Sequence, residues 1–237
     1  MFKRVLGISL FVPLVLASGL SAQDLPLVSV GVGLTTLSGG PADASESTLR
    51  AIGFDDSRGS ESMPSTYRAL APYIEVELGV SGKFGANIHL GKVRNHTLGH
   101  KNVPGAVTAA ELETNHEILT TAFFAVYRLN EYVDILGGPA IFRKRLTLDP
   151  LSGSSLPPFE KTDVGWAAGT ELTFINRLPY YGSVSIQYRH AGSLAIPETT
   201  VDLGDSAGKP FGTVVWPASS IGFSHWAFAV GGGFYIP

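Results

Sequence analysis

Apolar and polar residues alternate along eight stretches of this chain, and the connections between the stretches are alternately long and short. We expect strands over about 27–37, 67–80, 84–94, 114–129, 132–146, 164–174, 180–193 and 221–236. A period of two places successive side chains on opposite faces of a strand. Tight turns at one end and large loops at the other are typical of an up-and-down barrel that crosses an outer membrane.

The two faces of the predicted strands differ in chemistry. Between residues 74 and 80, aliphatic side chains alternate with Glu75 and Glu77. Two carboxylates are costly in an apolar core, whereas a polar lumen accommodates them. The pattern therefore predicts an all-β fold, an eight-stranded antiparallel up-and-down transmembrane β-barrel, with its apolar face toward lipid. A soluble lipocalin-like barrel is the alternative, but it would turn its apolar face inward.

The stretch 114–129 leaves the direction of its side chains open, because both of its faces are apolar. One set comprises Ile118, Ala122, Phe124 and Val126, and the competing set comprises Leu119, Phe123 and Tyr127. We favour the first set outward, which places Glu117 and Thr121 in the lumen.

A break in the pattern occurs within 132–146, at Gly137-Gly138-Pro139. Proline has no N–H to donate to a strand ladder, so we predict a β-bulge at this position. The direction of Arg143, Lys144 and Arg145 beyond the break is left open.

The N-terminus has the features of a secretory signal peptide. Lys3 and Arg4 precede an apolar stretch over 5–16, and small residues lead to an expected cleavage site after Ala22. We divide the chain into a signal peptide, 1–22, and an outer-membrane barrel, 23–237. An uncleaved anchor helix is the alternative for the first segment.

Composition and charge exclude several kinds of site. The chain has no cysteine, which excludes a lipoprotein anchor, disulfides and thiolate metal sites. Its formal charge of −3 becomes −5 without Lys3 and Arg4, and a mildly acidic chain argues against nucleic acid as a partner. His96 and His100 have a metal-binding spacing only on a helix, which this segment does not resemble. We expect no metal and no other cofactor.

From about Gln23 to Pro237 the chain resembles the small eight-stranded outer-membrane proteins of Gram-negative bacteria, the OmpA/OmpX type. The resemblance rests on the strand pattern and not on a signature motif. It implies a monomer in the cell outer membrane, exported by a cleaved signal peptide, with outer-membrane lipids and lipopolysaccharide as partners. One departure is the C-terminus: such proteins commonly end on an aromatic residue, whereas Phe234 and Tyr235 here precede Ile236 and Pro237.

The predicted lumen contains a set of polar side chains that we expect to pair with one another. The set comprises Glu75, Glu77, His89, Glu117, Glu171, Gln187 and Arg189. Isolated charges inside a narrow barrel are costly, so cross-lumen salt bridges are the favoured interpretation. On this interpretation Arg189→Ala lowers thermal stability because carboxylates lose a partner. A narrow small-solute channel is the alternative role for the same residues.

The segment from Tyr188 to Ser193 is similar to the segment that carries the catalytic His and Ser of outer-membrane lipid A 3-O-deacylases. That resemblance implies an ester hydrolase with His190 as base and Ser193 as nucleophile. In the family the Ser follows the His by two residues, whereas here it follows by three, which on a strand is the opposite face unless Gly192 forms a bulge. The orienting Glu of the last strand has no counterpart in 221–236.

Taken together, these features favour a structural or surface-interaction role through four long extracellular loops, with an extracellular ligand bound by the loops. The acidic, Ser-rich first loop, about 38–66, is expected to be solvated and mobile. The lipid A esterase and the channel are the alternatives. Whether the protein is an enzyme is left open, and the features favour a protein that is not one.

Overall fold

The computed structural model describes residues 28–38, 40–54, 65–68, 71–81, 83–177 and 179–236. The predicted signal peptide, residues 1–22, and its cleavage site lie outside the described residues. No helix among the described residues is long and apolar enough to cross a membrane.

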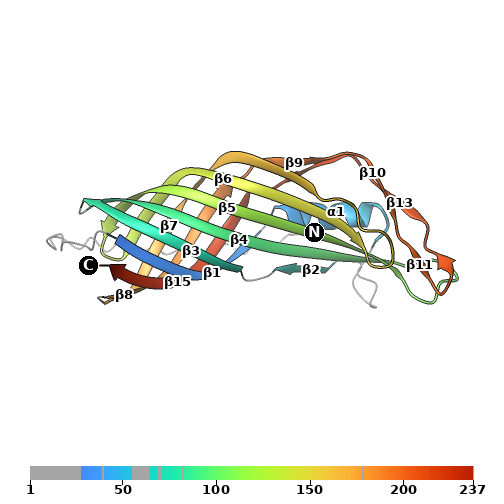
Figure 1. Cartoon of the computed structure of the whole chain (residues 1–237), viewed down its shortest axis with the longest axis horizontal. Coiled ribbons are helices and arrows are strands. Elements are labelled where there is room, and N and C mark those ends of the chain that lie inside the picture. Colours follow the sequence, from blue (N-terminus) through green and yellow to red (C-terminus); the bar gives the residue numbers. More distant parts are fainter. Residues whose placement is uncertain are drawn as a thin grey trace, which may run out of the picture.

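Eight antiparallel strands form a closed ring in which each pairs with the next along the ring (Figure 1). They are β1 (Val28–Ser38), β3 (Ala71–Ser81), β4 (Phe84–Lys101), β5 (Ala110–Asn130), β6 (Val133–Pro150), β7 (Phe159–Arg177), β8 (Tyr180–His190) and β15 (His225–Ile236). β15 pairs with β1 and closes the ring, while the short β2 (Ser65–Arg68) pairs with the far part of β4. The predicted up-and-down barrel is confirmed. A closed ring leaves no strand edge unpaired, and a β-sheet can cross a bilayer only under that condition.

The two ends of the barrel differ. Short turns join β3 to β4, β5 to β6 and β7 to β8 at the end where the C-terminus lies (Figure 1). We call this the short-turn end and the opposite end the long-loop end.

The outer wall of the barrel carries an apolar belt. Exposed hydrophobic side chains of the belt include Leu34, Ile74, Leu78, Ile88, Leu90, Leu119, Phe123, Ile135, Ile141, Val164, Leu172, Val184, Phe228 and Val230. Aromatic pairs lie at both margins, with Phe84 and Tyr127 5.3 Å apart near the short turns and Tyr188 and Trp226 5.2 Å apart at the other margin. Such a belt faces lipid, as predicted.

The favoured direction of the side chains in β5 was wrong. Ile118, Ala122, Phe124 and Val126 are buried inside, while Leu119 and Phe123 are exposed on the outer wall. Glu117 consequently lies on the outer wall as well. β5 runs between lipid on one side and an apolar interior on the other, so its pattern contains no polar face to reveal the direction.

The predicted bulge at 137–139 was also wrong. Ala122 pairs with Ala140 and Ala125 with Gly137, so neither strand gains a residue between these pairs. Gly138 accommodates the break differently: a Cβ there would lie 1.9 Å from the carbonyl oxygen of Phe123. The absent side chain allows the two backbones to approach closely, and the regular register continues.

α1 (Pro41–Ala51) occupies the first long connection. Pro41 at its start and Arg50 in its last turn suit the two ends of a helix. Leu49 and the following Phe54 are 0% and 1% exposed, and Phe54 packs on Gly99 of β4. We expected a mobile loop over 38–66, but 41–54 is folded because these apolar side chains are buried. Residues 55–64 of this loop lie outside the described residues.

The last long connection forms a two-stranded extension that we call the arm, residues 193–222. β9 (Ser193–Ile196) pairs with β14 (Ser219–Gly222), β10 (Thr199–Asp202) with β13 (Thr213–Trp216), and β11 (Asp205–Ser206) with β12 (Lys209–Pro210). The arm continues beyond β8 and β15 toward the end of the molecule opposite the C-terminus (Figure 1). One predicted strand, 180–193, is therefore two, because Gly192 with a φ of +64° interrupts it.

An apolar core fills the interior of the long-loop half. It combines side chains of the extended β4–β6, α1 and the arm, including Leu49, Leu112, Phe142, Leu146, Leu148, Ile196, Val201, Trp216 and Phe223. A wet interior, which we predicted for the whole barrel, is therefore confined to the short-turn half.

Candidate functional site

Polar side chains from four strands of the ring, β3, β4, β7 and β8, line the short-turn half of the lumen. β3 provides Glu75 and Glu77, β4 provides His89, β7 provides Glu171 and β8 provides Gln187 and Arg189, all directed inward as predicted. Each lies on the face opposite the apolar belt because successive residues of a strand alternate between its faces.

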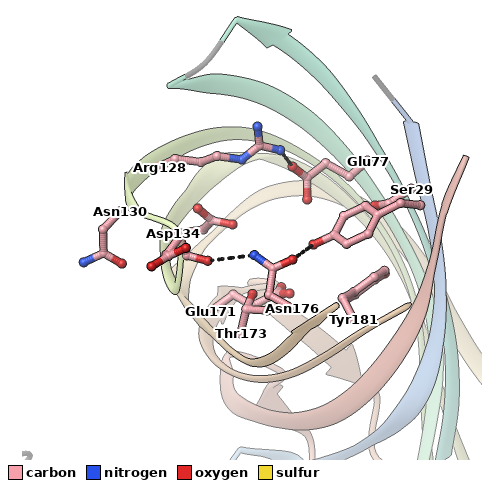
Figure 2. Close-up of a pocket in the computed structure, with 11 residues that line it drawn as sticks. Ser29, Glu77, Arg128, Asn130, Asp134, Glu171, Thr173, Asn176 and Tyr181 are labelled. Carbon is pink, nitrogen blue, oxygen red and sulfur yellow. Dashed lines mark hydrogen bonds and ion pairs between the residues drawn. The ribbon is translucent and has the colours of Figure 1, made fainter. Parts of the chain in front are cut away.

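Glu77 has the cation partner that we expected, but the cation is Arg128, which the sequence interpretation missed. The Arg128 guanidinium donates to Glu77 Oε1 at the mouth of the lumen (Figure 2). The wrong direction for β5 caused the omission, because it placed Arg128 on the lipid side. A correct direction for that strand would have found Arg128 and excluded Glu117.

Glu75 is held by a neutral partner. The Tyr181 hydroxyl donates to Glu75 Oε1 over 2.8 Å, in a buried contact across the barrel. Tyr73 stacks on His89 with ring centroids 4.6 Å apart. Neither tyrosine was among the predicted lumen residues, although both occupy inward positions of their strands.

Arg189 does not pair with carboxylates, contrary to our expectation. Its side chain is fully buried, and its Nε and Nη2 donate to Gln187 Oε1 at 3.2 and 2.9 Å. Nη2 also lies 3.0 Å from His89 Nε2. Within the part of the chain that the structure describes, no carboxylate is within ion-pair distance of this guanidinium. The predicted lumen network is therefore one ion pair, together with Glu75 and Arg189 each held by neutral hydrogen-bond partners, and not a chain of salt bridges.

A recess opens at the short-turn end of this lumen (Figure 2). It encloses about 430 Å³, including space open to solvent, and its lining comprises Ser29, Glu77, Arg128, Asn130, Glu131, Asp134, Glu171, Thr173, Asn176, Tyr181 and Tyr235. Acidic groups predominate over the single arginine. No group of three or more potential metal ligands occurs among the described residues. The recess is therefore polar and predominantly acidic.

Glu117 pairs with cations on the outer wall. Its carboxylate accepts from Lys92 Nζ and Arg94 Nε, each at 2.8 Å.

His190 and Ser193, the candidate catalytic pair, are not brought together as a pair. His190 is exposed, stacks on Trp166, and has Ser224 Oγ 3.2 Å from its Nδ1. Ser193 instead contributes its backbone carbonyl to Lys144. Among the described residues, no Asp or Glu forms an ion pair with His190, so an orienting carboxylate is missing from this part of the chain.

Lys144 joins the arm to the barrel. It points inward, is 0% exposed, and donates to Ala191 O at 2.8 Å, Ser193 O at 2.9 Å and a carboxylate oxygen of Asp163. These three acceptors satisfy all three ammonium hydrogens. Lys144 therefore secures the chain where β8 ends and the arm begins.

α1 is attached to the interior by a second buried polar contact. Ser45 Oγ lies 2.7 Å from Nε2 of His116, a residue of β5 beyond the apolar belt. Burial lowers the pKa of His116 to about 4, so its ring is neutral at neutral pH. The contact therefore depends on an uncharged imidazole.

No protein-family model and no curated protein matches the chain. The solved structure of Ail, the attachment invasion locus protein of Yersinia pestis, in complex with the heparin analogue sucrose octasulfate is 12% identical, with a TM-score of 0.46 over 87% of this chain and 96% of that chain. The outer membrane protein OprG from Pseudomonas aeruginosa is 12% identical, with a TM-score of 0.47 over 89% of this chain and 95% of that chain. In overall fold the chain is similar to these outer-membrane β-barrel proteins, as the sequence predicted.

Proposed function

We propose that this protein is an outer-membrane barrel that anchors a rigid extracellular platform for binding a surface ligand. The short turns face the periplasm, as do the start of β1 and the end of β15, and the long-loop half projects outward. The observation that carries the proposal is the apolar core of the projecting half, in which Trp216 and Val201 of the arm are 0% exposed. Loops whose only role was to close a pore would not require a buried apolar core.

The loops are joined to one another at the far tip. Thr108 Oγ1 donates to Ser206 Oγ at 2.9 Å, and Lys209 Nζ donates to the Gly105 carbonyl at 2.7 Å. A surface that is already ordered loses less conformational entropy on binding than a mobile loop does. The platform therefore favours recognition of a partner by a preformed surface.

Three hydrophobic side chains are exposed on the projecting half, outside the apolar belt. Val107, Leu151 and Val215 are 82%, 60% and 48% exposed and come from three different connections. Exposed apolar side chains on a rigid surface are candidate contacts for a protein partner. They define the variant that tests the proposal.

The experiment compares cells that display the full chain with cells that display Val107→Asp/Leu151→Asp/Val215→Asp. Binding to arrays of extracellular proteins and glycans is measured, and Ser154→Asp/Thr200→Asp/Thr213→Asp is the matched control because these residues are also exposed. We expect a ligand that binds the wild type and the control but not the apolar-site variant. Equal binding by all three chains would contradict the platform.

A conducting pore is not the function that we propose. Phe142, Leu146 and Leu148 are each 0% exposed within the long-loop half, so the interior is filled there. Steady ion currents through the purified protein in planar bilayers would refute the closed lumen. No observation supports the esterase as strongly, because His190 contacts Ser224 and no carboxylate among the described residues. Loss of a hydroxyacyl chain from lipid A on overexpression would reinstate it.

A further inference from the structure

A group of cations lies on the outer wall at the long-loop margin of the apolar belt. We call it the outward basic cluster; it comprises Lys92, Arg94, Arg143 and Arg145. Their side chains are 46%, 69%, 59% and 43% exposed. Lys92 and Arg143 both lie opposite Leu119, while Arg94 and Arg145 both lie opposite Glu117. The cluster therefore forms two rows across three adjacent strands, β4, β5 and β6.

The height of the cluster on the wall determines what it can contact. Leu119 in the first row is 41% exposed, and Leu90 and Ile141, two residues nearer the short-turn end, are 45% and 42% exposed. Adjacent strands are about 4.8 Å apart, so each row spans about 10 Å. Lysine and arginine cover apolar surface with their stems and place the charge in the polar layer. The cluster thus lies at the level of the lipid head groups.

Cations in this cluster outnumber the carboxylates around them. Glu117 is shared by Lys92 and Arg94, and Glu160 is shared by Arg143 at 2.9 Å and Arg145 at 3.4 Å. Four cations against two carboxylates leave an excess of two positive charges. Arg94 and Arg145 approach their carboxylates through Nε, which leaves the terminal guanidinium nitrogens for another acceptor. The whole chain has a formal charge of −3, so this excess is local.

We propose that the outward basic cluster binds the phosphate groups of the glycolipid in the adjacent leaflet, which is lipopolysaccharide in an outer membrane. Guanidinium groups bind phosphate oxygens through paired N–H donors, and the stems of the same side chains lie along the acyl chains. The inference rests on the proposed placement in the outer membrane. It adds a specific lipid site that the surface platform does not require.

The test uses the full chain in phosphatidylcholine nanodiscs, with bis-phosphorylated lipid A as the probe. Dephosphorylated lipid A and inorganic phosphate are the second and third probes. The variant is Lys92→Gln/Arg94→Gln/Arg143→Gln/Arg145→Gln. The matched control, Arg50→Gln/Lys83→Gln/Arg177→Gln/Lys209→Gln, removes the same charge from exposed cations elsewhere. Heat-modifiable migration in gel electrophoresis reports whether each chain has folded into the disc.

We expect the variant to bind bis-phosphorylated lipid A at least tenfold more weakly than the wild type and the control do. Dephosphorylated lipid A should bind weakly to all three chains. Arg94→Lys/Arg143→Lys/Arg145→Lys should retain most of the affinity because it keeps the charge. Equal losses in variant and control, or unchanged binding by the variant, would overturn the site. Comparable binding of inorganic phosphate would assign it to a free anion and overturn the lipid proposal.

Failure of the outer-membrane placement can be distinguished from failure of the lipid site. A chain that does not fold into the disc fails the outer-membrane placement, and with it both proposals. A chain that folds but does not distinguish the lipids contradicts the cluster alone.

Discussion

Replacement of Lys144 by methionine tests how the arm is held to the barrel. Methionine keeps most of the aliphatic volume of the lysine and removes the ammonium group, so cavity effects are small. The ammonium is 0% exposed and donates to two backbone carbonyls, at 2.8 Å to Ala191 and 2.9 Å to Ser193, as well as to Asp163. Asp163 is 25% exposed and can be hydrated when the lysine is absent.

The expected cost follows from the two carbonyls. Each buried acceptor that loses its partner costs about 1–3 kcal/mol, which gives about 2–6 kcal/mol in total. The arm can avoid this cost by separating from the wall and exposing the carbonyls to water. We therefore expect Lys144→Met to lower the free energy of opening of residues 193–222 by about 2 kcal/mol or more, which is roughly thirtyfold faster hydrogen exchange.

Hydrogen exchange measured by mass spectrometry on the folded protein in detergent gives this free energy for each peptide. Exchange in β3–β5 within the belt should stay unchanged. Lys209→Met is the matched control, because Lys209 is exposed and donates to a single carbonyl, that of Gly105. Exchange in 193–222 that differs less than about threefold between Lys144→Met and the wild type, or that rises equally in the control, would refute the reasoning.

Three further predictions address other parts of the barrel. Gly138→Ala should lower the folding yield, measured as the heat-modifiable fraction, because the new Cβ would lie 1.9 Å from a backbone oxygen. Gly137→Ala is the control and should fold normally, since a Cβ there meets nothing within 4 Å. Arg128→Met should lower the urea midpoint of unfolding in lipid vesicles by the equivalent of about 2 kcal/mol. Breaking a fully buried ion pair costs roughly 3–5 kcal/mol, and the cost here is smaller because the recess is open to water. Adding Glu77→Gln to this variant should restore the midpoint. Because the pKa of His116 is about 4 in the fold and 6.5 when exposed, only the open state takes up the proton between these values. Hydrogen exchange of α1, corrected for its intrinsic pH dependence, should therefore show easier opening as pH falls from 6.5 to 4, by up to about 3 kcal/mol, and His116→Gln should abolish this dependence.

Most inward and outward positions followed from the sequence because most strands separate lipid from a polar lumen. Glu75 and Glu77 alternate with aliphatic residues in β3, and both point inward as expected. β5 was the exception. Its inward Phe124 and its outward Phe123 are equally apolar, because β5 presents apolar side chains to the interior as well as to the lipid. The direction of such a strand depends on what its neighbours place on each side.

The candidate site was predicted as a set of residues but not as a set of contacts. Arg189 was correctly placed in the lumen, yet its partners are Gln187 and His89 and not a carboxylate. Pairing across a barrel depends on the register and height of strands that are far apart in the sequence. Period-two alternation reports only the face of a residue, so it cannot select partners on that face.

The amino-acid sequence alone determined the class of this protein: eight amphipathic strands, tight turns at one end and long loops at the other, and an apolar belt for lipid. These properties are local, since alternation and turn composition act over a few residues. Only the tertiary structure decided that the long loops form a solid body and that Lys144 attaches the arm. Only the register of β4–β6 brought Lys92, Arg94, Arg143 and Arg145 together on the wall. These features arise when distant segments are packed against each other and compete for the same buried space.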